Sequence, residues 1–348
     1  MSKTIRVLID GLGNANLPMV DLMVSEAERL ESSFGIRFQI VGAADSKGAA
    51  FSSTGIPAQQ IARVKKEQGT VAKIPELGHP GMTMKEVLQQ CDADIFVEGL
   101  PPFLPSGEPG FSNIIAAMSQ GMHVVSANKA PFALYWGELF AYAKSKNVMV
   151  RYGAAASAGL MTLEMGAALG RCGELLEMTG IFNASTMYVI QKMKEGTTFE
   201  EAVKGAREGG FLEPDPSMDI DGWDSAMKTV IQANTYWDKA YTLSDVEIHG
   251  IRDLSPEDIR RSQERGEVWC MIGSAVQEKD GGLKLWVGPK SIPAEHPVAK
   301  ARWCDKILYL KTRSQGEQVH SCLGASASGT AGNIFLDMIL IAREIAKK

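Results

Sequence analysis

Short apolar runs alternate with amphipathic segments along the first 150 residues. The apolar runs predict buried strands, whereas the segments between them repeat apolar residues at helical spacing. We expect strands at residues 4–10, 37–44, 93–98, 123–126 and 148–151, and helices at 18–33, 83–90, 111–120 and 131–145. This alternation predicts an α/β fold with a doubly wound parallel sheet, whose ligands bind at the carboxyl ends of the strands.

The pattern changes after residue 152. Residues 153–159 are Gly, Ala and Ser and predict a linker, and a helix is expected from Leu160. A strand runs into a helix at 180–188, a capping box at Thr198 opens another helix, and strands follow at 268–277, 283–287 and 307–312. We therefore predict a second, α+β domain with a mixed sheet.

These patterns divide the chain into three parts. Residues 1–152 form a dinucleotide-binding domain and residues 153–323 a substrate-binding and dimerisation domain. In residues 324–348 we expect a flexible turn up to residue 330 and an amphipathic helix at 331–346 that packs back on the first domain. Open sheet edges and an apolar face in the second domain predict a homodimer.

Composition narrows the class of protein. Of the 348 residues, 45% are hydrophobic and 22% charged, which is typical of a globular protein, and the net charge of −5 disfavours nucleic acid and anionic membranes. No secretion signal or membrane-length apolar run is present, so we expect a cytoplasmic protein. The five cysteines are scattered without metal-ligand spacing, and no metal site is expected.

A glycine turn follows the first strand. Gly11, Gly13 and Asn14 lead into the first helix, although Asn16 stands where a dinucleotide fingerprint has its third glycine. Such turns bring the backbone close to a pyrophosphate at a helix N-terminus, as in Rossmann-type domains. An NAD or NADP cofactor is therefore expected.

Polar residues end the later strands. Asp45 ends the second strand and would accept hydrogen bonds from ribose hydroxyls; an ordinary polar turn is the alternative. Ser46 and Lys47 follow, and Lys47 would favour a 2′-phosphate, so the choice between NAD and NADP stays open. Leu100 and Lys129 also follow strands, where functional residues are expected.

The strongest chemical signal is an acidic stretch between Glu213 and Lys228. Prolines at 214 and 216 favour an extended backbone before a helix that we expect Asp221 to cap. Asp224 and Lys228 then stand one helical turn apart, where their side chains can meet. Carboxylates suit a substrate ammonium group, and a lysine beside acids can exchange a proton with an alcohol or carbonyl oxygen. A solvated surface ion pair is the alternative.

Taken together, the chain resembles the homoserine dehydrogenase family in its short form, without a regulatory ACT domain. The markers occur in the family's order along essentially the whole chain: the glycine turn, Asp45–Gly48, Ser126–Lys129, Ala158–Leu160, Gly180–Asn183, Glu213–Pro216, Asp219, Gly222–Asp224, Lys228 and Gly329–Ala331. The resemblance implies reversible hydride transfer between NAD or NADP and the pair L-homoserine and L-aspartate 4-semialdehyde. It also implies a place in amino-acid biosynthesis, toward threonine and methionine.

The resemblance implies a role for each matched residue. Lys228 would exchange the proton on the reacting oxygen with support from Asp224, and Lys129 would assist at the hydride-transfer site. Glu213 and Asp219 would hold the substrate amino group, with Ser185 and Phe211 lining the pocket. The cofactor contacts would come from Gly11, Gly13, Asn14, Asp45, Ser46, Lys47, Leu100, Ala127, Asn128 and Gly329.

The pocket departs from the family pattern. Phe211 replaces a tyrosine that reaches the substrate, Ala184 and Ser185 replace a Gly-Thr pair, and Gly153 replaces an acid associated with a monovalent cation. Two alternatives follow: the same chemistry on another small hydroxy or oxo amino acid, or a catalytically silent nucleotide-binding protein.

Overall fold

The computed structural model describes residues 2–212, 215–324 and 327–347. Two compact units contain residues 1–159 with 326–348, and residues 160–325. The first unit is an α/β unit and the second an α+β unit, as the sequence predicts. Each unit is described by itself.

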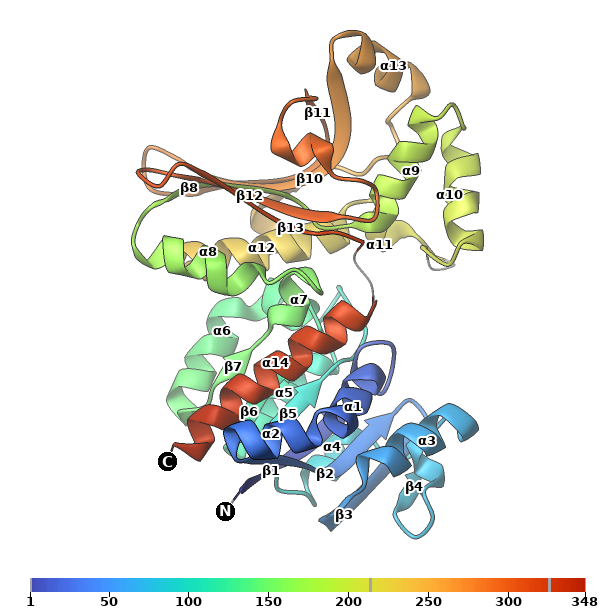
Figure 1. Cartoon of the computed structure of the whole chain (residues 1–348), viewed down its shortest axis with the longest axis vertical. Helices are drawn as coiled ribbons and strands as arrows, with labels where there is room; N and C mark the ends of the chain where they lie inside the picture. Colours follow the sequence, from blue (N-terminus) through green and yellow to red (C-terminus); the bar gives the residue numbers. More distant parts are fainter. Residues whose placement is uncertain (1, 213–214, 325–326, 348) are drawn as a thin grey trace. The chain divides into compact units, whose positions relative to one another are not determined.

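A parallel sheet forms the centre of the first unit (Figure 1). Its described strands follow the order β4-β3-β2-β1-β5-β6-β7. The parallel strands are β1 (Lys3–Asp10), β2 (Ile36–Asp45), β5 (Ile95–Glu98), β6 (His123–Ser126) and β7 (Val150–Arg151). They confirm all the strands predicted in this half of the chain. An antiparallel edge, β3 (Gly48–Ile56) and β4 (Gly78–Pro80), was not predicted.

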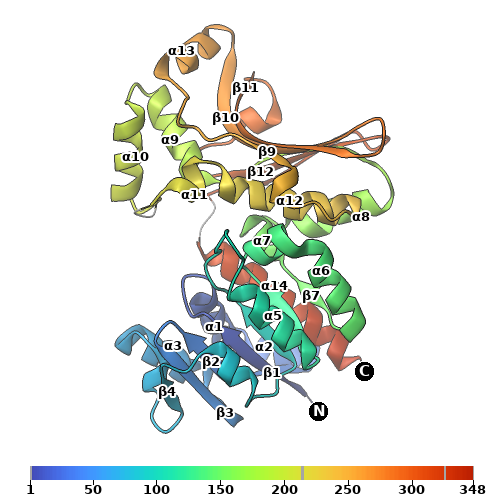
Figure 2. The same cartoon turned by 180° about the vertical axis from the view of Figure 1, so that it is seen from behind.

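Helices cover both faces of this sheet, as Figures 1 and 2 show from opposite sides. One layer consists of α1 (Asn16–Ser25), α2 (Ala27–Phe34), α3 (Ala58–Gln68) and α14 (Ala327–Ala346), whose apolar side chains share a core with alternate residues of β1. The other consists of α4 (Met84–Leu88), α5 (Gly110–Ser119) and α6 (Ala130–Lys146). A 3₁₀ turn, η1 (Val71–Lys73), follows α3.

Three helix predictions need correction. The single helix expected at 18–33 is two helices, because the chain breaks at Glu26. The small residues 153–157, expected as a linker, form α7 (Gly153–Ser157). The flexible turn expected up to residue 330 is helical from Ala327 onward. Alanine and serine are compatible with a helix wherever the backbone hydrogen bonds can close.

The C-terminal helix packs on the first unit. The Phe335 ring lies 6.1 Å from that of Phe38 in β2, and the buried Asp337 carboxylate accepts a hydrogen bond of 2.7 Å from Arg151 Nε. The backbone N–H of Gly153 donates to the other oxygen of Asp337. An apolar contact and an ion pair therefore both hold α14 against the parallel sheet.

The second unit contains a mixed sheet in the order β13-β12-β8-β10-β11-β9 within the described residues. Its strands are β8 (Leu175–Ile181), β9 (Val246–Ile248), β10 (Glu267–Gln277), β11 (Leu283–Pro293), β12 (Lys306–Thr312) and β13 (Glu317–Cys322). Among these described strands, only β9 pairs in parallel, with β11. The mixed sheet confirms the prediction, although β9 and β13 were missed.

The helices of the second unit carry the acidic stretch. They are α8 (Thr162–Arg171), α9 (Ala184–Lys194), α10 (Phe199–Glu208), α11 (Ser217–Ile220), α12 (Trp223–Trp237) and α13 (Pro256–Glu264), with 3₁₀ turns η2 (Leu243–Asp245) and η3 (Pro297–Lys300). A capping box at Thr198 begins α10, as predicted, and another at Ser255 begins α13. Helix α12 packs along α8 and against β10.

Close packing of α12 on α8 depends on a glycine. A Cβ atom at Gly166 would lie 2.2 Å from the ring of the buried Tyr236, whose hydroxyl donates to the carbonyl oxygen of Thr162. Gly166→Ala should lower the free energy of unfolding by about 1–3 kcal/mol, because the ring has no room to move. Gly332→Ala, in α14 with open space around it, should be neutral or raise it by up to about 1 kcal/mol. Urea unfolding measures both, and equal effects would contradict this packing.

Candidate active site

The start of α12 differs from the sequence prediction. Asp221 does not cap this helix, because α11 ends there and Gly222 occupies the position before α12 with φ +89°. The Asp221 carboxylate instead pairs with the Arg252 guanidinium. A glycine reaches this left-handed backbone conformation without strain, so it makes the tight turn from α11 into α12.

Asp224 and Lys228 meet on one face of α12. Lys228 Nζ lies 2.5 Å from Asp224 Oδ2 and donates a second hydrogen bond, of 2.8 Å, to the carbonyl oxygen of Phe182. Lys228 is 8% exposed, so the pair is not the solvated surface pair that was the alternative. A buried ammonium group needs such partners, since an unpaired buried charge is costly.

Asn183 joins this pair to a second acid. Its Nδ2 donates to Asp219 Oδ1 at 2.5 Å and to Asp224 Oδ2 at 2.8 Å, while its Oδ1 caps α9 by accepting from the Thr186 backbone N–H. The structure thus brings together Asp219, Asp224 and Lys228. The sequence marks Asn183 only as a residue between a strand and a helix, so its contacts with the acids were missed.

The other predicted substrate residues lie around the start of α9. Ser185 Oγ donates a hydrogen bond of 2.6 Å to the carbonyl oxygen of Phe211, which ties α9 to the segment before the acidic stretch. The Phe211 ring is 40% exposed and packs on the rings of Tyr188 and Trp303. Glu213 lies outside the described residues.

The first unit contains the glycine turn at the carboxyl end of β1. Gly11 has φ +82°, and a Cβ atom there would lie 3.0 Å from the carbonyl oxygen of Gly99. Gly13 and Asn14 are exposed. The buried Asn16 closes the turn, because its Nδ2 donates to the carbonyl oxygens of Asp10 and Gly11. The residue that stands in place of the third glycine therefore fixes the turn through side-chain hydrogen bonds.

The turn suits a pyrophosphate. The N-cap of α1 is Ala15, no side chain caps the helix, and its first turn has no acidic residue. The first turn of α1 therefore offers the positive end of the helix dipole without a carboxylate of its own to repel an anion. A cavity of about 570 Å³ lies at the carboxyl ends of β1 and β2, lined by Asp10, Asp45, Ser46, Leu100 and neighbours from α4 and α5. Its volume is that of a typical small-molecule site.

Asp45 is held by the protein itself. Oδ1 accepts hydrogen bonds from the Lys47 backbone N–H and Thr70 Oγ1, and Oδ2 accepts from Lys65 Nζ and the Val71 backbone N–H. Burial raises the pKa of Asp45, but these hydrogen bonds outweigh burial and hold the pKa below its usual value. A carboxylate has about four acceptor positions, so these four contacts compete with ribose hydroxyls for Asp45. Asp45 also lines the cavity, and its role in cofactor binding stays a prediction.

The remaining cofactor candidates lie at the ends of β5 and β6 and in α14. Asn128 Nδ2 donates to Glu98 Oε1 at 3.0 Å, and the neighbouring Ala127 donates its backbone N–H to the Glu98 carbonyl oxygen. Lys129 is the residue before α6 and is half-buried. Gly329 packs so closely on Gly159 that a Cβ atom there would lie 2.8 Å from the Gly159 Cα.

Two buried carboxylates lie at the carboxyl ends of the neighbouring strands β1 and β5. Asp10 and Glu98 are register partners in β1 and β5, and each is less than 5% exposed. Asn113 Nδ2 donates to Asp10, and Ser126 and Asn128 donate to Glu98. Burial raises the pKa of each to about 7, and the charge of Asp10 raises that of Glu98 further. Asp10 also lines the 570 Å³ cavity.

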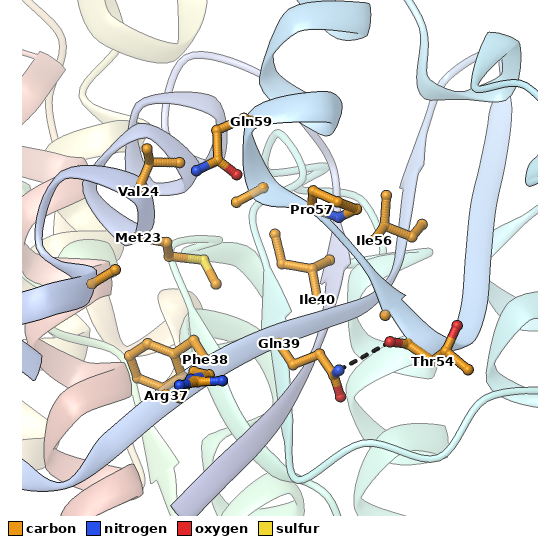
Figure 3. A pocket seen from close by; sticks show the side chains of 13 residues that line it. Met23, Val24, Arg37, Phe38, Gln39, Ile40, Thr54, Ile56, Pro57 and Gln59 are labelled. Atoms are coloured by element: carbon orange, nitrogen blue, oxygen red, sulfur yellow. Dashed lines mark hydrogen bonds between the residues drawn. The ribbon is translucent and has the colours of Figure 1, made fainter. Parts of the chain in front are cut away.

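A separate cavity of about 320 Å³ lies beside the amino-terminal half of β2 (Figure 3). Apolar side chains such as Met23, Phe38 and Ile56 surround it, and Gln39 Nε2 donates to the Thr54 carbonyl oxygen at its edge. None of the predicted site residues lines this cavity.

Within the described part of the chain, no cluster of His, Cys, Asp and Glu could hold a metal ion, and no helix could cross a membrane.

Known proteins resemble the chain over its full length. A family model described as homoserine dehydrogenase matches residues 139–339. The chain is 32% identical to a homoserine dehydrogenase of Methanocaldococcus jannaschii, covering 96% of this chain and 98% of that one. It is 29% identical to an NAD(+)-dependent homoserine dehydrogenase of Pseudomonas canavaninivorans, covering 99% and 97%. A putative homoserine dehydrogenase from Archaeoglobus fulgidus, solved as a crystal structure, superposes with a TM-score of 0.83 at 28% identity, covering 97% of this chain and 99% of that one.

The raised pKa of Asp10 predicts how stability changes with pH. The folded protein binds this proton more tightly than the unfolded chain, whose carboxyl has an ordinary pKa of about 4. The stabilising contribution is therefore complete below about pH 4 and is lost as the pH rises through about 7. Asp10→Asn should flatten the pH dependence in this window, by at most about 1.4 kcal/mol per pH unit.

Urea unfolding at a series of pH values measures this effect. Glu98→Gln should flatten the same window, because burial raises the pKa of Glu98 to about 7 as it does that of Asp10. Parallel stability profiles for the wild type and both variants would show that neither carboxyl keeps its proton in the folded state.

Proposed function

The chain belongs to the homoserine dehydrogenase family, and we propose that it interconverts L-homoserine and L-aspartate 4-semialdehyde with NAD or NADP. One observation carries this proposal: a buried lysine is held by an acid one helical turn away and joined through Asn183 to a second acid. This arrangement provides a group for proton exchange and a carboxylate for a substrate amine within one cluster.

The first unit would hold the cofactor. The glycine turn with the uncapped start of α1 suits the pyrophosphate, and the cavity beside it offers Ser46 and Leu100 to the rest of the nucleotide. We propose Ala127, Asn128 and Gly329 as further contacts. When bound, the nicotinamide ring supplies or accepts the hydride. The relative from Pseudomonas canavaninivorans is named NAD(+)-dependent, and we propose that this chain accepts NAD as well as NADP.

Lys228 would exchange the substrate proton. An ammonium group has three N–H donors, and two of those of Lys228 are directed to Asp224 and Phe182. The third has no partner among the described residues and can donate to the alkoxide oxygen that forms during reduction. In the oxidation direction the same nitrogen receives the alcohol proton. Lys129, after β6, would assist at the hydride-transfer site.

Asp219 would bind the substrate ammonium group. It stands in α11, next to Asp224 through the Asn183 amide, and a carboxylate forms a charge-assisted hydrogen bond with an amine. We propose the same role for Glu213. The carboxylates thus fix the amino end of the substrate while Lys228 faces its reacting oxygen.

A second candidate function concerns the substrate. Phe211 has no hydroxyl group, and the Ser185 hydroxyl already donates to the Phe211 carbonyl oxygen. The polar contacts that this part of the pocket can make are therefore reduced, which favours another small hydroxy or oxo amino acid as the alternative. A catalytically silent nucleotide-binding protein is less favoured, because it would not need a buried Lys228 held by two partners.

Assembly and location are further parts of this proposal. We propose a homodimer formed through the second unit, where the described strands β10 and β13 expose Val276 and Val319. Sedimentation velocity at micromolar concentration should show twice the mass of one chain; a monomer would exclude the dimer.

We also propose a cytoplasmic location, which the scattered free cysteines support.

Removing the lysine tests the mechanism. Lys228→Ala should reduce kcat with homoserine by at least about 10³-fold, because proton transfer loses its donor, while nucleotide affinity stays nearly unchanged. Lys228→Met, which retains much of the side-chain volume, should give the same loss without opening a cavity. Initial rates with NAD and NADP and a nucleotide titration measure both quantities.

Lys192→Ala is the matched control, since this lysine pairs with Glu195 in the exposed part of α9. It should keep wild-type kinetics. An active Lys228→Ala enzyme would refute the assigned role. If the wild type oxidises only an analogue of homoserine, the second candidate substrate is correct, and nucleotide binding without turnover of any hydroxy amino acid would show a silent protein.

A further inference from the structure

Asn183 connects the two acids of the candidate active site through one nitrogen atom. It lies between β8 and α9 and is 5% exposed. One N–H of Nδ2 is directed to Asp219 Oδ1 and the other to Asp224 Oδ2, the same oxygen that accepts from Lys228 Nζ. A continuous series of hydrogen bonds therefore runs from Asp219 through Asn183 and Asp224 to Lys228.

The amide has only one orientation that satisfies its surroundings. Its Oδ1 accepts from the Thr186 backbone N–H at 2.9 Å and from Thr186 Oγ1 at 3.0 Å. Reversing the amide would place Oδ1 against two carboxylates and its NH₂ group against the N–H of Thr186. Each donor and acceptor of the side chain is thus used, and the helix cap fixes the direction in which the NH₂ group points.

The amide also separates two like charges. Asp219 and Asp224 both lie within hydrogen-bond distance of one nitrogen, and carboxylates this close disfavour each other's ionised form unless donors offset the repulsion. Lys228 provides such a donor to Asp224 only. Asp219 accepts from the Asn183 amide, which donates without adding a charge that would compete with the substrate ammonium group.

We propose that Asn183 is a positioning residue for the reaction. It holds Asp224 Oδ2 against Lys228 and at the same time holds Asp219 in place for the substrate amine, so one amide couples proton transfer to amine binding. This inference rests on the proposed function. A purely structural role, the cap of α9, would need only the Oδ1 atom of Asn183.

Asn183→Asp separates these two roles. Aspartate is as good a helix cap as asparagine, so the bond to the Thr186 N–H survives, but both donors to the acids are lost. The new carboxylate also stands beside Asp219 and Asp224 and disfavours their ionised forms. We expect kcat/KM for homoserine to fall at least about 10-fold at neutral pH, through both kcat and KM, and the acid limb of its pH profile to move up by about one unit.

Asn183→Ser tests the positioning role without an added charge. Serine also caps a helix, but its hydroxyl is too short to join the two acids. It should lower kcat/KM by a similar factor with a smaller shift of the acid limb. Nucleotide affinity should stay at the wild-type value in both variants, because the first unit is unchanged.

Thr198→Ala is the matched control. Thr198 caps the neighbouring helix α10, and its hydroxyl exchanges hydrogen bonds with Glu201 of the same helix. Its loss should lower the melting temperature and leave kcat/KM and the pH profile unchanged. If Asn183→Asp behaves in the same way, with only a lower melting temperature, Asn183 is a cap and the positioning role is wrong.

The Lys228 variants distinguish this result from a failure of the proposed function. If Lys228→Ala is inactive and Asn183→Asp retains wild-type kinetics, only the role of Asn183 is refuted. If Lys228→Ala is active, the proposed chemistry itself fails, whatever the Asn183 variants show.

Discussion

The burial of the Lys228 ammonium group is the constraint on which the second unit depends. A cation at this depth must find fixed acceptors, and it finds one on its own helix and one in the carbonyl oxygen that ends β8. Asp224 in turn needs the Asn183 amide, which the N-terminus of α9 holds in place. The Lys228 charge therefore has all its partners only when four segments have folded together: the end of β8, the starts of α9 and α12, and α11.

The first unit also buries ionisable groups, but there the hydrogen-bond partners of the buried carboxyls are neutral. Asp10 and Glu98 end adjacent parallel strands, and the groups that bond their carboxylates are the amides of Asn113 and Asn128, the Ser126 hydroxyl and a backbone N–H. No cation faces them in these contacts, and their pKa values rise to about 7 accordingly. Asp45 on the next strand has a lysine and a lowered pKa. Three neighbouring acids thus differ because their partners differ.

The sequence predicted those features that depend on residues a few positions apart, such as helix starts and contacts within one helix. Capping boxes predicted the starts of α4 and α10, and the spacing of Asp224 and Lys228 predicted their contact on α12. The antiparallel strand β3 was missed, because its Gly, Ala and Ser residues show no apolar alternation. Asn183 and the partners of Asp45 depend on contacts between segments 20 or more residues apart, which periodicity does not reveal.

The residues that differ from the family pattern bear on the choice of substrate more than on the type of reaction. Lys228 is buried, and hydrogen bonds link it to Asp224 and, through Asn183, to Asp219, so a change in any of the three leaves a charge without its partner. Phe211 and Ser185 contact this segment through an exposed ring and a hydroxyl bonded to the backbone, where a substitution costs little. The hydrogen-bonded cluster is therefore the part of the candidate active site that the fold constrains most, whereas Phe211 and Ser185 can change without disturbing it.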